Sequence, residues 1–171
     1  MWCYGVGMFD RWYANALLKK LERPYVHLMF GARQTGKSTL LRSVLSKDAL
    51  LIDLSDLLER SRLLANPEVF SQTCRAMSTT RGVQTVFVDE IQTVPALFDA
   101  VQNLYDSDKE RWRFILCGSS TRRLRGANVN LLPGRSFLHR LYPLTLVEHP
   151  PVSLSAEIGR ASCRERVYSG V

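Results

Sequence analysis

Several features are missing from this chain of 171 residues, and each absence excludes a class of protein. No apolar run approaches the roughly twenty residues of a membrane-spanning helix, and the N-terminus has no basic segment followed by a long apolar stretch and a cleavage site. The four cysteines form no CxxC pair and have no histidine at metal-ligand spacing, which argues against a disulfide framework and a zinc site. We therefore expect a cytoplasmic protein that does not contact the membrane and whose thiols are buried or incidental.

The composition is that of an ordinary globular domain, with 46% hydrophobic and 23% charged residues. The formal net charge of +7 permits contact with nucleic acid. The densest basic cluster, Arg122, Arg123 and Arg125, lacks the interleaved aromatics that would stack on bases. Because this cluster also fits a solvated or subunit-facing surface, nucleic acid and a homo-oligomer both stay open as partners.

The most informative stretch is GARQTGKS at residues 31–38, which fits the P-loop spacing G-x-x-x-x-G-K-[ST]. An apolar run precedes it and a helical pattern follows. A chance match to the motif would not need these flanks, so their presence favours a true P-loop. Lys37 adds positive charge for a phosphate, and Ser38 offers a hydroxyl to Mg²⁺. The backbone and side chains that we expect to bind the nucleotide are Gly31, Ala32, Arg33, Gln34, Thr35, Gly36, Lys37, Ser38 and Thr39.

A second motif, TVFVDE at residues 85–90, is typical of a Walker B strand that delivers two acids at its carboxyl end. Asp89 would hold Mg²⁺ through its water shell, and Glu90 would act as a catalytic residue by orienting the water that attacks the γ-phosphate. A strand that ends in a surface acidic pair is the alternative. The order and distance of the two acids after the P-loop favour the catalytic interpretation.

Two further catalytic candidates follow. In ILCGSS, Ser119 or Ser120 would act as a sensor beside the γ-phosphate, with Ser119 preferred because it comes first after the strand and its glycine; a plain strand-to-helix turn is the alternative. In LLPGR, Arg135 would supply positive charge to a phosphate, either in its own site or as an arginine finger on a neighbouring subunit. An ordinary surface arginine fits Arg135 equally well.

The elements alternate between strand and helix. This alternation predicts an α/β protein with three layers, in which helices cover both faces of a parallel sheet. Trp12 and Leu17 are expected on the inner side of the first helix, Trp112 is a packing residue, and His27 and His139 are satisfied structural histidines. We expect buried strands at residues 25–30, 49–54, 83–88 and 113–117 with a fifth at 136–141, and helices at 8–23, after the P-loop, at 57–64, at 67–77, from residue 95 and up to 132.

The ordered motifs GARQTGKST, VFVDEIQ, FILCGSS, LPGR and RLYPLTLVE resemble the AAA-type ATP-binding proteins of bacteria and archaea that carry a C-terminal domain of unknown function. The resemblance covers most of residues 8–148. It implies a five-stranded, mainly parallel sheet of order 5-1-4-3-2, from the additional-strand, catalytic-glutamate class of P-loop proteins. It also implies ATP and Mg²⁺ as ligands and roles for Lys37, Ser38, Asp89, Glu90, Ser119 and Arg135.

We divide the chain into an N-terminal segment with an amphipathic helix at residues 1–24, an ATPase core at 25–148 and an end segment at 149–171. Residues 1–7 fit no element, and Met8 would be a sensible true start. Residues 157–171 have no apolar period and resemble the translation of a sequencing adapter, so we expect the natural chain to continue past about residue 156.

Mg²⁺-dependent hydrolysis of ATP to ADP and phosphate, coupled to the missing C-terminal domain, is the function that these motifs favour. We expect the present chain alone to hydrolyse ATP weakly, because the helical lid of the family that it resembles is absent. A nucleotide-dependent switch with little turnover, with or without DNA, is the alternative. A small-molecule kinase would share the P-loop but gains nothing from a water-activating Glu90. The lack of an N/T-K-x-D motif argues against a GTPase, and the lack of an LSGGQ-like motif argues against a transporter ATPase.

Overall fold

The computed structural model describes residues 11–77, 82–119, 134–145 and 148. Contacts group Tyr13–Pro143 into one compact unit, and Met1–Trp12 with Leu144–Val171 into a second. In the second unit, the Glu148 carboxylate accepts hydrogen bonds from the Arg11 guanidinium and from the backbone N–H of Trp12. The sheet and all the predicted site residues that are described lie in the first unit.

Five strands form one sheet in which every neighbouring pair is parallel. Read from one edge the order is β2-β3-β4-β1-β5, which is the expected order 5-1-4-3-2 read from the other edge. The strands are β1 (Val26–Phe30), β2 (Leu50–Asp53), β3 (Gln84–Asp89), β4 (Trp112–Gly118) and β5 (Ser136–Arg140). Because β4 lies between β1 and β3, the segments that follow these three strands meet at one edge of the sheet.

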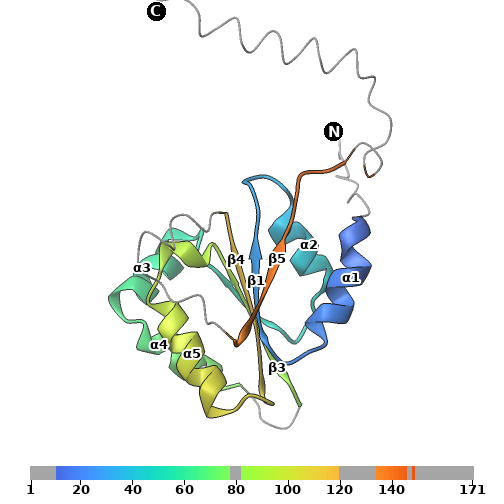
Figure 1. Cartoon of the computed structure of the whole chain (residues 1–171). Helices are drawn as coiled ribbons and strands as arrows, with labels where there is room; N and C mark the ends of the chain where they lie inside the picture. The colour runs from blue at the N-terminus through green and yellow to red at the C-terminus, as the bar shows by residue number, and fades with distance from the viewer. Residues whose placement is uncertain (1–10, 78–81, 120–133, 146–147, 149–171) are drawn as a thin grey trace, which may run out of the picture. The chain divides into compact units, whose positions relative to one another are not determined.

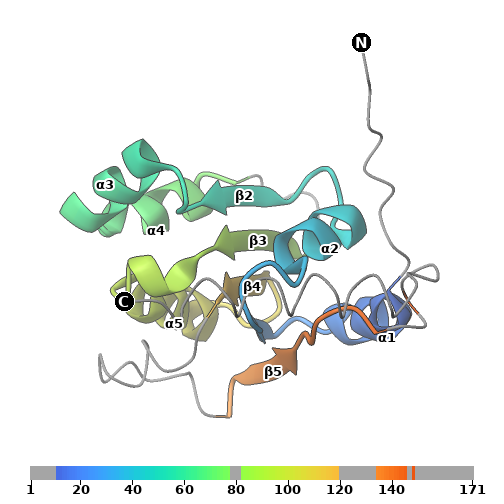
Figure 2. The same cartoon turned by 90° about the horizontal axis from the view of Figure 1, so that it is seen from above.

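Helices cover both faces of this sheet, which confirms the three-layer prediction (Figures 1 and 2). One face carries α1 and α2, and the other carries α4 and α5. None of the helices in the described ranges is long and apolar enough to cross a membrane. The helical elements are α1 (Trp12–Leu21), α2 (Lys37–Val44), α3 (Leu57–Ala65), α4 (Glu68–Arg75), the 3-10 turn η2 (Ile91–Thr93) and α5 (Leu97–Ser107).

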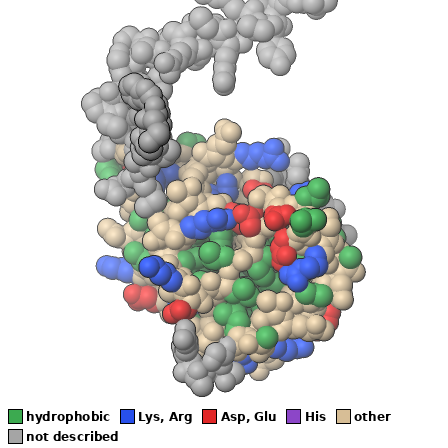
Figure 3. Space-filling model, turned by 180° about the vertical axis from the view of Figure 1, so that it is seen from behind, with side chains coloured by type: hydrophobic (Ala, Val, Ile, Leu, Met, Phe, Trp, Pro, Cys, Tyr) green, Lys and Arg blue, Asp and Glu red, His purple; other side chains and the backbone are tan. Residues whose placement is uncertain are grey.

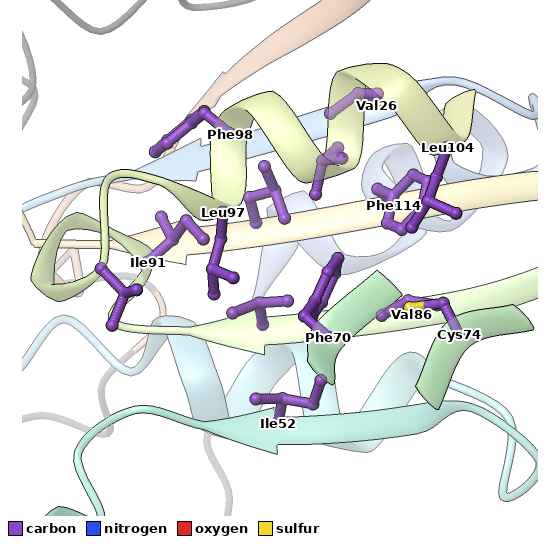
Figure 4. Packing of buried hydrophobic residues seen from close by; sticks show 14 of the residues in the cluster. Val26, Ile52, Phe70, Cys74, Val86, Ile91, Leu97, Phe98, Leu104 and Phe114 are labelled. Atoms are coloured by element: carbon purple, nitrogen blue, oxygen red, sulfur yellow. The ribbon is translucent and has the colours of Figure 1, made fainter. Parts of the chain in front are cut away.

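Successive side chains of a strand point to opposite faces of the sheet, and the central strands are buried on both faces because helices cover both. On β3, Val86 and Val88 pack towards α4 and α5, whereas Phe87 packs towards α1 and α2. Phe70 of α4 is fully buried in the first of these clusters, close to Ile52 and Val86 (Figure 4). The two apolar clusters hold both helical layers against the sheet.

Two packing predictions are wrong. Only Ile52 of β2 is buried, and Leu51 is 51% exposed, because β2 lies at the edge of the sheet and helices do not cover both of its faces. Trp12 is the first residue of α1 and is 70% exposed, whereas Leu17 and Leu21 form the buried side of this helix. The predicted helical stretch up to residue 132, with Ser120 and the basic cluster at 122–125, lies outside the described residues.

Several arginines of the described surface belong to local ion pairs. Arg42 of α2 lies 2.6 Å from the Asp53 carboxylate, and Arg62 of α3 lies 2.6 Å from the carboxylate of Glu59. On the face shown in Figure 3, Lys and Arg side chains are likewise interspersed with Asp and Glu side chains. These paired arginines fit a solvated surface.

Candidate functional site

The three predicted motifs meet at the carboxyl edge of the sheet. The P-loop follows β1, the acidic pair Asp89 and Glu90 follows β3, and Ser119 follows β4. Phe30, the last residue of β1, pairs with Gly118 at the end of β4, and Val88 of β3 pairs with Leu116. The sheet therefore brings the three motifs together at its carboxyl edge, where open α/β sheets bind ligands.

The P-loop backbone needs glycine at two positions, for different reasons. A Cβ atom on Gly31 would lie 2.2 Å from the carbonyl oxygen of Leu141, whose own N–H donates to Phe30. Gly36, directly before α2, has φ 79°, a left-handed conformation that favours glycine. Since Gly36 has no side chain to cap the first N–H groups of α2, these donors are available to an anion at the helix N-terminus.

Two side chains close the loop on itself. The Lys37 ammonium donates to the carbonyl oxygen of Ala32 at 2.6 Å, and the Thr35 hydroxyl donates to the same oxygen at 3.0 Å. Lys37 and Thr35 are both buried, whereas Arg33 and Gln34 are exposed. The positive charge of Lys37 is thus held inside the curl of the loop.

Asp89 and Ser38 lie on the same face of the sheet. Asp89 follows Phe87 by two residues on β3, so it shares the face that α2 covers, and α2 carries Ser38. The thiol of Cys117, on the neighbouring strand β4, lies close enough to the Asp89 carboxylate and the Ser38 hydroxyl to interact with both. Burial, and then the Asp89 charge, raises the pKa of Cys117, so the thiol stays neutral.

These oxygen groups suit a hard cation. No group of three or more His, Cys, Asp and Glu side chains in the described ranges is arranged to hold a metal ion. Mg²⁺ is commonly bound by one or two protein oxygens together with substrate phosphates and water. The pair of Ser38 and Asp89 fits that requirement when phosphates complete the coordination.

Glu90 lies where the chain turns sharply after β3. Its φ of 55° is left-handed, and its backbone N–H donates to the Asp89 carboxylate at 3.0 Å. The Gln92 side-chain amide donates to the Glu90 carboxylate and also lies 3.5 Å from the Ser119 hydroxyl. Sequence reasoning did not select Gln92, although it is the last residue of the motif VFVDEIQ.

The structure does not place Arg135 beside the P-loop of its own chain. Arg135 precedes β5, and its carbonyl oxygen accepts a hydrogen bond from Val26 at the start of β1. Since Arg140 is the β5 residue that pairs with Phe30, Arg135 lies roughly 16 Å from the P-loop edge at about 3.3 Å per residue. Its guanidinium pairs with Asp106 at 2.7 Å, so the prediction of a phosphate contact within one chain is wrong, and a contact to a neighbouring subunit stays a prediction.

The two described histidines are hydrogen-bonded structural residues, as predicted. His27 Nε2 lies 3.1 Å from the carbonyl oxygen of Arg23, His27 Nδ1 lies 3.0 Å from His139 Nε2, and His139 Nδ1 lies 2.8 Å from the Tyr13 hydroxyl. The carbonyl can only accept, so one chain of donors satisfies all three contacts, from Tyr13 to His139, from His139 to His27 and from His27 to Arg23. Both rings are neutral in this arrangement.

Residues 23–149 match the protein family described as AAA domain. The chain belongs to this AAA domain family. The chain is also 34% identical over 134 residues to two uncharacterized mycobacterial proteins, Rv2008c of Mycobacterium tuberculosis and Mb2031c of Mycobacterium bovis. Each alignment covers 78% of this chain, which spans only 28% of the length of these relatives.

Among solved structures, the chain is similar to the Walker-type ATPase PABY2304 of Pyrococcus abyssi. The TM-score is 0.57 at 19% sequence identity, and the match covers 96% of this chain and 60% of that one. This likeness establishes a shared fold.

Proposed function

We propose that this AAA domain binds ATP with Mg²⁺ and hydrolyses it to ADP and phosphate. The observation that carries the proposal is the meeting of the P-loop with Asp89 and Glu90 at one sheet edge, where Asp89 lies on the face that α2 and its Ser38 cover. A surface acidic pair would not require this connection to the P-loop. Membership of the AAA domain family supports the same conclusion.

The P-loop has the parts that a phosphate chain requires. Backbone N–H groups of the loop and of the first turn of α2 surround the phosphates, and the partial positive charge of the helix N-terminus adds attraction. Lys37 exchanges its contact with the Ala32 carbonyl for a contact with a phosphate oxygen, which is a stronger acceptor because it is charged. Lys37 is therefore a binding residue, and the same positive charge makes it a catalytic one because it stabilises the charge on the transferred phosphoryl group.

Ser38 and Asp89 would hold Mg²⁺, which neutralises charge on the outer phosphates when bound. Cys117 lies beside both oxygen ligands, and its neutral thiol can donate to the Asp89 carboxylate and accept from the Ser38 hydroxyl. Glu90 accepts a proton from the attacking water and orients that water towards the γ-phosphate. Ser119, at the end of the neighbouring strand, contacts the γ-phosphate as a sensor.

The wider assignment goes beyond the site. The position of β4 between β1 and β3 supports the additional-strand, catalytic-glutamate class. The greater length of the mycobacterial relatives supports coupling of the ATPase unit to a further region. We propose a cytoplasmic protein that works as a homo-oligomer, in which Arg135 reaches a neighbouring site after release from Asp106.

Phosphate release from ATP by the purified 171-residue chain, with and without Glu90→Gln, tests the proposed hydrolysis. The variant keeps the shape of the side chain but cannot take the proton from water, so we expect at least a 100-fold loss of kcat with unchanged ATP binding. Asp99→Asn, on α5, is the matched control and should turn over as the wild type does. Equal turnover by Glu90→Gln would remove Glu90 from its role, and ATP binding without release by the wild type would favour the nucleotide-dependent switch.

A further inference from the structure

One buried amide touches both catalytic candidates that follow β3 and β4. Gln92 is 7% exposed, and its Nε2 donates to a carboxylate oxygen of Glu90 and lies 3.5 Å from the Ser119 hydroxyl. The orientation of the amide follows from this contact, because a carboxylate accepts hydrogen bonds and only the Nε2 end of the amide can donate one. Gln92 is thus a direct link between Glu90 and Ser119.

The backbone around Gln92 is built to return its side chain to Glu90. Gln92 lies in the 3-10 turn Ile91–Thr93, whose N–H and hydroxyl groups at Thr93 both donate to the carbonyl oxygen of Glu90 at 2.9 Å. Ile91 is fully buried in the core and fixes this turn to the sheet. The short turn leaves the Gln92 amide beside the carboxylate two residues earlier.

The environment of the amide oxygen of Gln92 indicates that the Nε2 group, the donor, is the functional end of this side chain. Gln92 Oε1 is buried and has no hydrogen-bond partner among the described residues, which costs stability. A Cβ atom on Gly118 would lie only 2.4 Å from this oxygen and 2.9 Å from the Phe30 ring. The glycine at the end of β4 therefore leaves space for the Gln92 amide, although the amide oxygen makes no hydrogen bond there.

We propose that Gln92 is a positioning residue for Glu90 and Ser119. It holds one oxygen of the Glu90 carboxylate so that the other oxygen faces the attacking water, and it fixes the position of the Ser119 hydroxyl relative to that carboxylate. This inference rests on the role proposed for Glu90. A carboxylate at a left-handed turn has several side-chain directions available, and a charge-assisted hydrogen bond selects one of them. Positioning of this kind acts on kcat rather than on nucleotide affinity.

Two substitutions test the proposal on the 171-residue chain. Gln92→Leu removes the whole amide, and Gln92→Glu keeps its shape but replaces the donor with an oxygen that repels Glu90. We expect both variants to lower kcat for ATP at least tenfold while KM changes less than twofold. Gln84→Leu is the matched control, since Gln84 is similarly buried at 8% but lies at the opposite end of β3, where its amide donates to the Gly82 carbonyl.

A double-mutant cycle measured by thermal unfolding, called the thermal cycle below, tests the contact between Gln92 and Glu90 independently of the proposed hydrolysis. Gln92→Leu is made in the wild type and in a Glu90→Leu background, and the midpoints of unfolding are compared. The contact exists only when Glu90 is present. Gln92→Leu should therefore lower the midpoint of unfolding by about 2 °C or more beyond its effect in the Glu90→Leu background. Equal shifts in both backgrounds, unchanged kcat in Gln92→Leu, or retained kcat in Gln92→Glu would overturn the positioning role. Undiminished turnover in Glu90→Gln would instead refute the proposed function and leave the thermal cycle to decide the contact.

Discussion

The buried pair of His27 and His139 predicts a free energy of unfolding that falls in mild acid. Burial, together with the neighbouring His27 and Lys20, lowers the pKa of His139 from 6.5 to about 4. Between these two pH values the unfolded chain binds a proton at this residue that the folded chain does not bind. Stability from His139 is therefore complete above about pH 6.5 and is lost as the pH falls towards 4.

The size of this effect follows from the two pKa values. Lowering the pH from 7 to 5 removes about 2 kcal/mol of unfolding free energy through His139, or about 4–8 °C in midpoint for a chain of this length. The pKa of His27 is also lowered, mainly by burial, and acts in the same direction.

The assay compares wild type with His139→Gln by urea denaturation at pH 7 and at pH 5. The amide of glutamine can accept from Tyr13 and donate to His27, but it does not titrate. We expect the stability lost on substitution to be about 2 kcal/mol greater at pH 7 than at pH 5. An equal loss at both pH values would refute the neutral hydrogen-bonded chain.

Two further substitutions test the packing that supports the site. Gly31→Ala forces a Cβ atom to within 2.2 Å of the Leu141 carbonyl oxygen, so we expect a displaced loop and at least tenfold weaker ATP binding by titration calorimetry; wild-type affinity would contradict the close approach. Trp112→Ala removes a side chain that is 1% exposed and stacks on Phe114, so we expect a loss of about 3–5 kcal/mol in urea denaturation. A loss below about 1 kcal/mol would show that Trp112 does not belong to the core.

Much of the fold could be predicted because strong local signals coincide with the global arrangement. The apolar runs before the P-loop and before Asp89 are buried on both faces, and the observed strands begin and end within one or two residues of the predicted ranges. The strand order came from the resemblance rather than from these runs. Local periodicity fixes an element but does not choose its neighbours.

The errors arise where position in the sheet decides the outcome. Leu51 belongs to an apolar run but lies on an edge strand, and Trp12 fits a helical stripe but is the first residue of its helix. Arg135 directly precedes β5, and because β5 runs parallel to β1, Arg135 lies at the opposite end of the sheet from the P-loop, a consequence of strand direction that its glycine turn alone does not reveal. Gln92 escaped notice because its role depends on Glu90 and Gly118, a contact that spacing alone does not reveal.

Binding of ATP to the 171-residue chain and to its Lys37→Ala variant, measured by titration calorimetry with Mg²⁺ present, tests the central claim most directly. We expect saturable binding by the wild type and at least a tenfold loss of ATP affinity in the variant, equivalent to about 1.4 kcal/mol. The reason is that the Lys37 ammonium, now held at the Ala32 carbonyl, supplies the positive charge that binds a phosphate. Lys109→Ala, an exposed lysine beyond α5, should bind as the wild type does. Absence of ATP binding by the wild type, or equal affinity in Lys37→Ala, would contradict nucleotide binding at the P-loop.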